Sequence, residues 1–315
     1  MQDYCPPLFL SNGHLQTIYP SLFRKLNPAF YNRERINTPD NDFLDLDWSR
    51  VSSKKIAIIS HGMEGSSHRH YVIGMAKALN MAGWDVLAWN FRSCSGEINR
   101  KLRFYHSGTT DDLQTVIDHV NNTGNYQELA LVGFSMGGNQ ILVYLGEQAE
   151  KANQIISKAC VFSVPCHLKS SAEELARFSN KIYMKRFLKF LHQKIKIKMD
   201  MFPGQIDDKD FQLVKTFKDF DDRYTSKIHG FKNAEDYWKK CSSKYFIPEI
   251  KIPTLIVNSL NDPFLAEECY PHTEVDENKF VCLETPKYGG HVGFVSFNKS
   301  GLYYSEQRAI EFLNA

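Results

Sequence analysis

Short apolar runs alternate with helix-like segments through the first half of the chain. Runs typical of strands occur at residues 33–38, 43–48, 55–60, 84–89, 129–132 and 159–164. Between them, apolar residues three or four positions apart predict helices at residues 70–82, 111–120 and 140–145. The second of these helices is expected to begin with Thr109 or Thr110 as its cap. Because strands alternate with helices, we predict an α/β protein with a doubly wound, mainly parallel sheet.

The alternation stops between residues 167 and 247. This stretch is rich in Lys, Asp, Phe and Tyr, and its patterns are helix-like without a convincing central strand. Strand patterns return at residues 252–258 and 280–284, and a helical pattern follows at residues 303–313. A segment that leaves the sheet and later returns to it is typical of a cap over an active site. We therefore predict one domain, residues 1–315, with a cap insertion at residues 167–247.

The segment before the first strand pattern has no clear period. It contains Asn12-Gly-His-Leu-Gln-Thr-Ile-Tyr-Pro20, and we interpret residues 6–23 as an irregular arm that lies on the main domain. The first residues lack a basic region followed by an apolar stretch, so we expect no signal peptide.

Composition narrows the class of protein. The 315 residues carry a formal net charge of +2, which gives no indication of a nucleic-acid partner. Seven cysteines without C-x-x-C pairs argue against a disulfide framework, and we expect a reduced, cytoplasmic setting. No apolar run approaches the roughly 20 residues that span a bilayer, so we expect a soluble protein without stable membrane insertion. The sequence does not indicate an oligomeric state.

The clearest chemical signal is Gly133-Phe-Ser-Met-Gly137, which directly follows the apolar run 129–132 and precedes a buried helix pattern. A strand that turns into a helix through G-x-S-x-G is a nucleophile elbow, in which the serine has a strained backbone and an exposed hydroxyl group. Side chains at Gly133 and Gly137 would collide with the neighbouring strand and helix. We therefore predict that Ser135 is a nucleophile, with the positive end of the helix dipole behind it.

A serine nucleophile needs a base and an acid that orients the base. Asp262 follows the strand pattern that ends at residue 258, and His291 follows the one that ends at residue 284. The order Ser135, Asp262, His291 is the one expected for α/β-hydrolases. The alternatives are an Asx-turn for Asp262 and a plain surface loop for His291. Asp221 and Asp222 in the insertion are competing acids.

Acyl transfer at a serine also needs two N–H donors for the developing oxyanion. The first is expected to be the backbone N–H of Met136, the residue after the serine. The second comes from the loop after residue 60, where we assign the N–H of Met63. A simple turn at His61-Gly62 after a buried strand is the alternative.

Motifs spread over nearly the whole chain resemble those of the YheT-like family of the α/β-hydrolase (abhydrolase) superfamily. They lie at residues 12–17, 61–66, 90–96, 105–108, 133–139, 220–222, 229–231, 261–264 and 290–294. The resemblance implies the α/β-hydrolase fold, a catalytic triad of Ser135, Asp262 and His291, and hydrolysis of carboxylic esters. One departure is Ser93, where the family usually has glycine, and this residue bears on the backbone shape of its loop.

Other polar residues receive structural interpretations. We interpret Cys94 as a structural thiol, because no base lies near it in sequence. Arg92 and Asp111 are candidates for an ion pair that is either structural or positions a loop. We expect no metal site and no organic cofactor, since the histidines in this half of the chain lack the His-Glu-x-x-His arrangement. These histidines are His61, His68, His70 and His106.

Together these features predict a serine hydrolase that cleaves small-molecule carboxylic esters through an acyl-enzyme. An acyltransferase with the same three residues, or a non-catalytic ligand-binding protein of the same fold, are the alternatives. Aromatic side chains of the insertion are expected to line an apolar pocket above Ser135, which favours medium-chain acyl or lipid-like esters.

The insertion also contains a basic stretch at residues 181–198. We interpret it as a solvated cap helix, with peripheral contact to anionic lipid as the alternative. Its cations are Lys181, Lys185, Arg186, Lys189, Lys194, Lys196 and Lys198.

Overall fold

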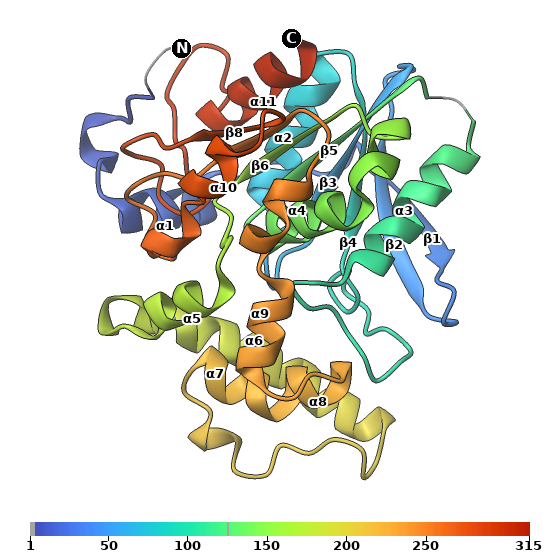
Figure 1. Ribbon diagram of the computed structural model, residues 1–315, viewed down its shortest axis with the longest axis vertical. Helices are drawn as coiled ribbons and strands as arrows, with labels where there is room; N and C mark the ends of the chain where they lie inside the picture. The colour runs from blue at the N-terminus through green and yellow to red at the C-terminus, as the bar shows by residue number, and fades with distance from the viewer. Residues whose placement is uncertain (1–3, 125) are drawn as a thin grey trace.

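The computed structural model of the protein describes residues 4–124 and 126–315, and an eight-stranded sheet forms the centre of this part of the chain (Figure 1). The strands are β1 (Asn32–Asn37), β2 (Phe43–Ser49), β3 (Lys55–Ser60), β4 (Asp85–Asn90), β5 (Glu128–Phe134), β6 (Lys158–Phe162), β7 (Thr254–Val257) and β8 (Val281–Glu284). Their order across the sheet is β1-β2-β4-β3-β5-β6-β7-β8. The pairs β1–β2 and β2–β4 are antiparallel, and the remaining pairs are parallel. The prediction of a mainly parallel α/β sheet is confirmed.

Helices cover both faces of this sheet. The helices of the described residues are α1 (Gly13–Phe23), α2 (His70–Met81), α3 (Thr110–Asn122), α4 (Met136–Gln148), α5 (Leu168–Ala176), α6 (Lys181–Met201), α7 (Phe217–Phe220), α8 (Ser226–His229), α9 (Ala234–Cys241), α10 (His272–Asp276) and α11 (Tyr304–Asn314). Those on the two faces of the sheet include α2 and α11 on one side and α3 and α4 on the other. Ile56 and Ile58 of β3 belong to the core under α3 and α4. Ala57 and Ile59 belong to the core under α2 and α11. Successive side chains of a strand point to opposite faces, so a strand covered on both sides needs the continuous apolar run seen in the sequence.

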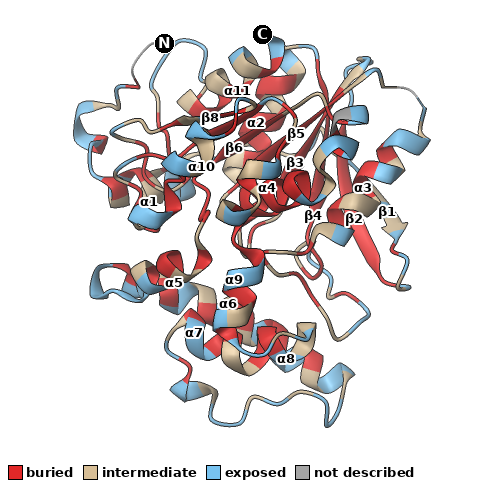
Figure 2. Cartoon of the chain, in the orientation of Figure 1, coloured by how far each residue is buried: buried red, intermediate tan, exposed pale blue. Residues whose placement is uncertain are grey.

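Between β6 and β7 the chain leaves the sheet and forms α5 to α9, in the lower part of Figure 1. No strand occurs between residues 163 and 253, all of which are described. These helices share a hydrophobic core of their own, against which Met63 from the loop after β3 and Phe264 from the loop after β7 also pack. The insertion therefore sits over the carboxyl edge of the parallel strands. Figure 2 shows buried and exposed stretches alternating along these helices. No helix among the described residues is both long and apolar enough to cross a lipid bilayer.

The N-terminal arm is more regular than its sequence pattern predicts. Residues Leu8–Leu10 form a 3-10 helix and Gly13–Phe23 form α1, so the prediction of an irregular segment is wrong. The side-chain oxygen of Asn12 caps α1 by accepting hydrogen bonds from two N–H groups of its first turn, at 2.9 and 3.2 Å. Pro20 lies in the last turns of the helix without ending it. Residues 1–3, which belong to the N-terminus without a signal-peptide pattern, lie outside the described residues.

Helix α3 begins without the side-chain cap that the sequence predicts. Thr109 occupies the cap position, but its hydroxyl oxygen accepts a hydrogen bond from the N–H of His106 at 2.9 Å. Asp111 and Asp112 lie in the first turn instead, where carboxylates interact favourably with the helix dipole.

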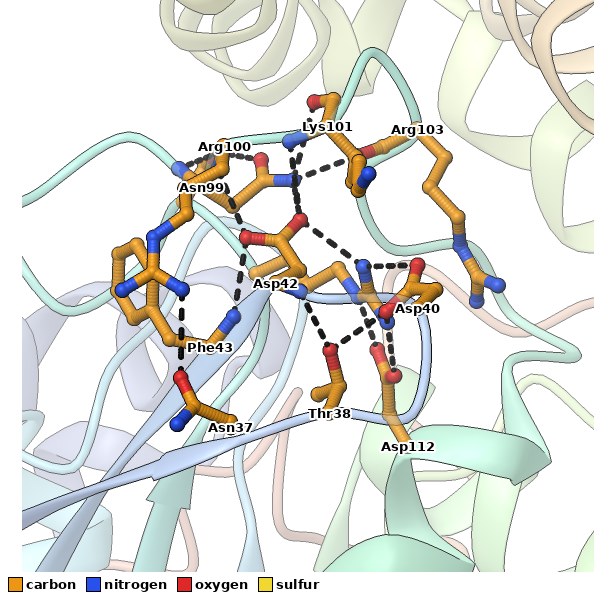
Figure 3. A network of polar contacts seen from close by, with 12 residues as sticks. Asn37, Thr38, Asp40, Asp42, Phe43, Asn99, Arg100, Lys101, Arg103 and Asp112 are labelled. Carbon is orange, nitrogen blue, oxygen red and sulfur yellow. Dashed lines mark hydrogen bonds and ion pairs between the residues drawn. The ribbon is translucent and has the colours of Figure 1, made fainter.

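A buried cluster of charges joins the turn between β1 and β2 to the loop after β4 (Figure 3). The guanidinium group of Arg92 is almost fully buried and forms ion pairs with Asp40 (2.8 Å), Asp42 (2.9 Å) and Asp112 (2.7 Å). Burial acts to raise the pKa of Asp40, but hydrogen bonds from Arg92 and Thr38 outweigh it and hold that pKa to about 2. The cluster fixes the loop that leads from β4 towards the insertion.

In the same loop, one predicted ion pair is wrong, and the serine at position 93 that departs from the family pattern has a structural explanation. Arg92 does not pair with Asp111, which instead forms an ion pair with Arg103 at 2.9 Å. Ser93 has a φ of 64°, in the left-handed region that favours glycine. Its hydroxyl group donates to the side-chain oxygen of Asn99 at 2.5 Å and accepts from the N–H of the same residue at 3.2 Å. These bonds hold a serine in a conformation that glycine adopts without strain.

We predict that Arg92→Met destabilises the fold by about 3–5 kcal/mol, because it leaves buried carboxylates without their counter-ion. Arg103→Met is the matched control, since its ion pair with Asp111 is largely exposed and should contribute less than about 1 kcal/mol. Urea unfolding followed by circular dichroism measures both losses. Similar losses for the two variants would contradict the prediction.

Candidate active site

Ser135 lies in a sharp turn between β5 and α4. Its backbone has φ 53° and ψ −122°, a strained conformation for a residue with a side chain. A Cβ atom at Gly133 would lie 2.7 Å from the Cα of Gly138 in α4, and one at Gly137 would collide with the carbonyl of His61 after β3. The two glycines therefore permit the close packing that the sequence motif predicts.

His291 and Asp262 form a hydrogen-bonded chain with this serine. The Nε2 atom of His291 lies 2.9 Å from the Ser135 hydroxyl oxygen. Its Nδ1 atom lies 2.9 Å and 3.1 Å from the two carboxylate oxygens of Asp262. The Asp262 side chain is completely buried, and one of its oxygens also accepts from the N–H of Phe264 at 2.9 Å. The Asx-turn considered as an alternative for Asp262 thus exists alongside the contact with the histidine.

The competing acids in the insertion do not contact the histidine. The carboxylate of Asp221 accepts from the hydroxyl of Thr225 at 2.6 Å and from the indole N–H of Trp238 at 2.9 Å. Burial raises the pKa of Asp221 to about 7. Asp222 forms an ion pair with Lys218 at 2.6 Å. The structure therefore brings Asp262, and neither competitor, to His291.

The N-terminal helix supports the loops that carry both residues, a role that sequence reasoning missed. The N–H of His291 donates to the hydroxyl oxygen of Thr17 at 2.9 Å. The side-chain amide of Asn261 donates to the carbonyl of Ser11 at 2.9 Å, and its oxygen accepts from the N–H of Gly290 at 3.0 Å. The sequence did carry a signal for this role, namely the family motif at residues 12–17. These residues cap and form the first turns of α1, which lies beside the two loops.

Met63 and Met136, the predicted oxyanion donors, both line the space beside Ser135. Within the described parts of the chain, neither backbone N–H has a hydrogen-bond partner. The turn before Met63 is fixed by His61, whose Nδ1 donates to the carbonyl of Gly62 at 2.7 Å and whose Nε2 accepts from the N–H of Phe91 at 3.1 Å. Burial lowers the pKa of His61 to about 3, so the imidazole stays neutral.

Glu64, the residue after Met63, is held at each of its polar groups. Its φ of 51° lies in the left-handed region. Its N–H donates to the hydroxyl of Tyr105 at 3.1 Å, and its carbonyl accepts from the guanidinium of Arg69 at 2.7 Å. Its carboxylate forms an ion pair with Lys194 of α6 at 2.7 Å. The insertion is thus tied directly to the turn that carries Met63.

Two cations of the basic stretch therefore contradict the interpretation of a wholly solvated helix. Besides Lys194, the fully buried Lys198 donates to the carbonyl of Asn99 at 2.7 Å and to that of Lys101. Burial lowers the pKa of Lys198 to about 8. Both lysines point from α6 into the loops after β3 and β4.

Cys94 also belongs to this contact region. Its sulfur atom lies 3.2 Å from the Nζ of Lys194. Burial raises the pKa of the thiol to about 11, so it is protonated at neutral pH, in agreement with a structural thiol. No group of three or more His, Cys, Asp or Glu among residues 4–124 and 126–315 could hold a metal ion.

Two cavities meet at Ser135 and His291. One, of about 80 Å³, lies under the insertion. Its apolar wall consists of Leu168, Ala172, Leu175, Phe187, Phe217 and Trp238. The other is a cleft of about 480 Å³ between α1, the loop after β3 and α6. The cationic side chains of Arg69 and Arg186 line this cleft, whereas the first cavity has no cation in its wall.

Comparisons with known proteins identify the family and the fold of the chain. The family model described as alpha/beta hydrolase fold matches residues 58–272. YheT of Escherichia coli strain K12 is 33% identical over 300 residues, which cover 93% of this chain and 87% of that protein. Human phospholipase ABHD3 is 28% identical over 304 residues, which cover 93% of this chain and 74% of that protein.

Among solved structures, the esterase Pf2001 of Pyrococcus furiosus matches with a TM-score of 0.60 at 19% identity, over 98% of each chain. That likeness concerns the fold. The family model covers more than half of this chain, and the match to YheT extends over most of both proteins. The chain therefore belongs to the YheT-like branch of the α/β-hydrolase fold family.

Proposed function

We propose that the protein hydrolyses carboxylic esters through an acyl-enzyme on Ser135. The observation that carries the proposal is the hydrogen-bonded chain from the Ser135 hydroxyl through His291 to Asp262, at the point where two cavities meet. Relatives named as ester-cleaving enzymes support it, among them phospholipase ABHD3 and the monoacylglycerol lipase of Saccharomyces cerevisiae.

The mechanism follows from the donors and acceptors of the site. The Nε2 atom of His291 accepts the hydroxyl proton as Ser135 attacks the ester carbonyl. The N–H groups of Met63 and Met136 stabilise the negative charge on the carbonyl oxygen. His291 then donates the proton to the leaving alcohol, and the acyl group stays on Ser135. In the second half, His291 takes a proton from water, the water attacks the acyl-enzyme carbonyl, and the carboxylic acid leaves as Ser135 regains its proton. Asp262 holds the neutral histidine in the tautomer with a proton on Nδ1 and stabilises the imidazolium.

The two cavities suggest how an ester would lie. The apolar cavity under the insertion suits the acyl chain, because leucine and aromatic side chains form its wall. The larger cleft suits the alcohol half, and it leads to the surface between α1 and α6. In this proposal, residues 167–247 act as a cap, and the substrates are medium-chain or lipid-like esters.

The test of the proposed function is Ser135→Ala. This variant should lose ester hydrolysis by at least about a thousandfold, because the covalent route is removed. It should also lose labelling by a fluorophosphonate probe while keeping the circular dichroism of the unchanged protein. Ser300→Ala, in an exposed loop, is the matched control. Full activity in Ser135→Ala would refute the proposal, and product analysis with an added alcohol separates hydrolysis from acyl transfer.

The choice of acid gives a second prediction. Asp262→Asn should lower kcat by about a thousandfold or more, since the amide keeps the space but favours the wrong tautomer of His291. Its stability in urea should change far less than its activity. Asp221→Asn and Asp222→Asn should retain most activity, because both carboxylates are bound within the insertion. Asp222 lines neither cavity and is the matched control, whereas Asp221 also lines the cavity under the insertion. A larger loss in either variant than in Asp262→Asn would reverse the assignment.

Acyl chain length gives a third prediction. Each buried methylene contributes about 0.8 kcal/mol, so four extra carbons in the apolar cavity should raise kcat/KM by about two orders of magnitude. We expect p-nitrophenyl octanoate to be preferred over the acetate. Ala172→Phe, which fills the cavity wall, should lower the octanoate-to-acetate ratio by about tenfold. A kcat/KM that falls steadily from acetate through butyrate and octanoate to palmitate would contradict the role of this cavity.

A further inference from the structure

Exposed apolar side chains gather on three segments that meet beside the active-site cleft. Leu8 before α1 is 99% exposed and Phe178 between α5 and α6 is 89% exposed. Four further side chains, each half or more exposed, lie on the same segments and on the loop after β7. We call the set the apolar rim: Leu8, Leu15, Leu22, Phe178, Ile182 and Leu260.

Hydrogen bonds next to these residues hold the three segments together. The ring of His14 lies 3.2 Å from the hydroxyl of Tyr183, which joins the start of α1 to the start of α6. The side-chain amide of Asn180 donates to the carbonyl of Pro263 at 2.7 Å, and that of Asn261 donates to the carbonyl of Ser11. In Figure 1, α1 and the loop between α5 and α6 lie on the same side of the molecule, at the left. The rim is therefore one face and not three separate sites.

The cleft that leads to Ser135 opens within this face. Leu22 of the rim lines the cleft, together with Ile18 from α1 and Phe190 from α6. Ser135 and His291 line the same cleft at its inner end. A molecule bound at the rim would thus have a direct path to the reactive hydroxyl.

The two segments that carry most of the rim have charges of one sign only, and that sign is positive. The chain as a whole is nearly balanced, with 38 Lys and Arg against 36 Asp and Glu. Yet residues 4–32 and 175–199, which carry five of the six rim side chains, contain no Asp or Glu. The loop at residues 258–266, which carries Leu260, has one acidic residue, Asp262, and its side chain is fully buried. Along α6, Lys181, Lys185 and Lys189 recur every four positions and are exposed, so they lie on one side of the helix beside Ile182. None of these three lysines forms an ion pair with a described residue.

From these observations we propose that the apolar rim and the lysines of α6 dock the protein on an anionic phospholipid bilayer, with the cleft facing the lipid. Apolar side chains enter the headgroup region while lysines contact the lipid phosphates, the combination by which interfacial proteins bind. Docking would let lipid-like esters pass from the bilayer to Ser135 without entering water. This consequence rests on the proposed function, whereas the docking itself does not. A second copy fits the face less well, because pairing it with itself would oppose lysine to lysine without a carboxylate.

Vesicle sedimentation tests the docking. The protein should sediment with vesicles of phosphatidylcholine containing about one-third phosphatidylglycerol, and far less with phosphatidylcholine alone. The triple variant Lys181→Gln, Lys185→Gln, Lys189→Gln should bind the anionic vesicles about a hundredfold more weakly. The double variant Leu8→Ser, Phe178→Ser should also weaken binding, because it removes the two most exposed apolar side chains.

The matched control is Lys54→Gln, Lys151→Gln, Lys279→Gln. These exposed lysines precede β3, β6 and β8, at the opposite edge of the sheet, and their loss should leave vesicle binding unchanged. Equal weakening in both triple variants, or no sedimentation of the unchanged protein, would overturn the proposal. So would a dimer, detected by analytical ultracentrifugation, that Leu8→Ser, Phe178→Ser converts to a monomer.

Hydrolysis of soluble p-nitrophenyl butyrate separates this proposal from the proposed function. The rim and lysine variants should keep that activity, because the substituted residues line neither cavity. Vesicle binding without any ester hydrolysis would support the docking and refute the enzymatic proposal. Ester hydrolysis without vesicle binding would do the reverse.

Discussion

The strained turn at Ser135 is the constraint on which the rest of the site depends. A residue with a side chain is held at φ 53° because β5 is packed between β3 and β6 and because α4 begins at the next residue. The N–H of Ser135 donates to the carbonyl of Phe162 in β6 at 2.9 Å, which anchors the turn to the neighbouring strand. Strain of this kind persists only where the surrounding structure over-determines it, and here the sheet supplies that rigidity.

Parallel strands then determine where the other polar groups lie. β7 and β8 end at the same edge of the sheet as β5, so the loops after them reach the serine without a long excursion. These loops have no regular strand or helix at Asp262 and His291, so hydrogen bonds to neighbouring segments fix their shape. Helix α1 and the residue before its cap contribute two of these bonds, between Thr17 and His291 and between Ser11 and Asn261. The N-terminal arm is therefore part of the site, although it contributes no group to the chemistry.

The insertion is coupled to the sheet by charge as well as by apolar packing. Lys194 and Lys198 are buried at the boundary, where a lysine without partners would be costly. The first is paired with Glu64 beside Met63, and the second is surrounded by backbone carbonyls of the loop after β4. Movement of α6 would expose or unpair these groups. The position of the insertion and the shape of the turn at Met63 are therefore linked energetically.

Local pattern was sufficient for much of the fold. Continuous apolar runs predicted the buried strands, and G-x-S-x-G directly after such a run predicted the turn at Ser135, because both signals depend on neighbours in sequence. Asp262 and His291 each follow a predicted strand, which is why the sequence predicted them as partners of the serine. In the structure His291 contacts both Asp262 and Ser135. The family usually has glycine at position 93, and this preference was the sequence signal for the positive φ that Ser93 adopts.

Only the tertiary structure decided which charged side chains are buried and what they contact. Asp111 and Asp112 are adjacent in sequence, yet the packing of α3 turns Asp112 to Arg92 and leaves Asp111 exposed. Lys194 and Lys198 look like Lys185 and Lys189 in the sequence, but the loops facing α6 offer acceptors only to the first two. The sequence alone therefore determined the strands and the reactive turn, which are local properties. The tertiary structure determined the charge pairs, the support from α1 and the exposed rim, because each depends on segments far apart in the chain.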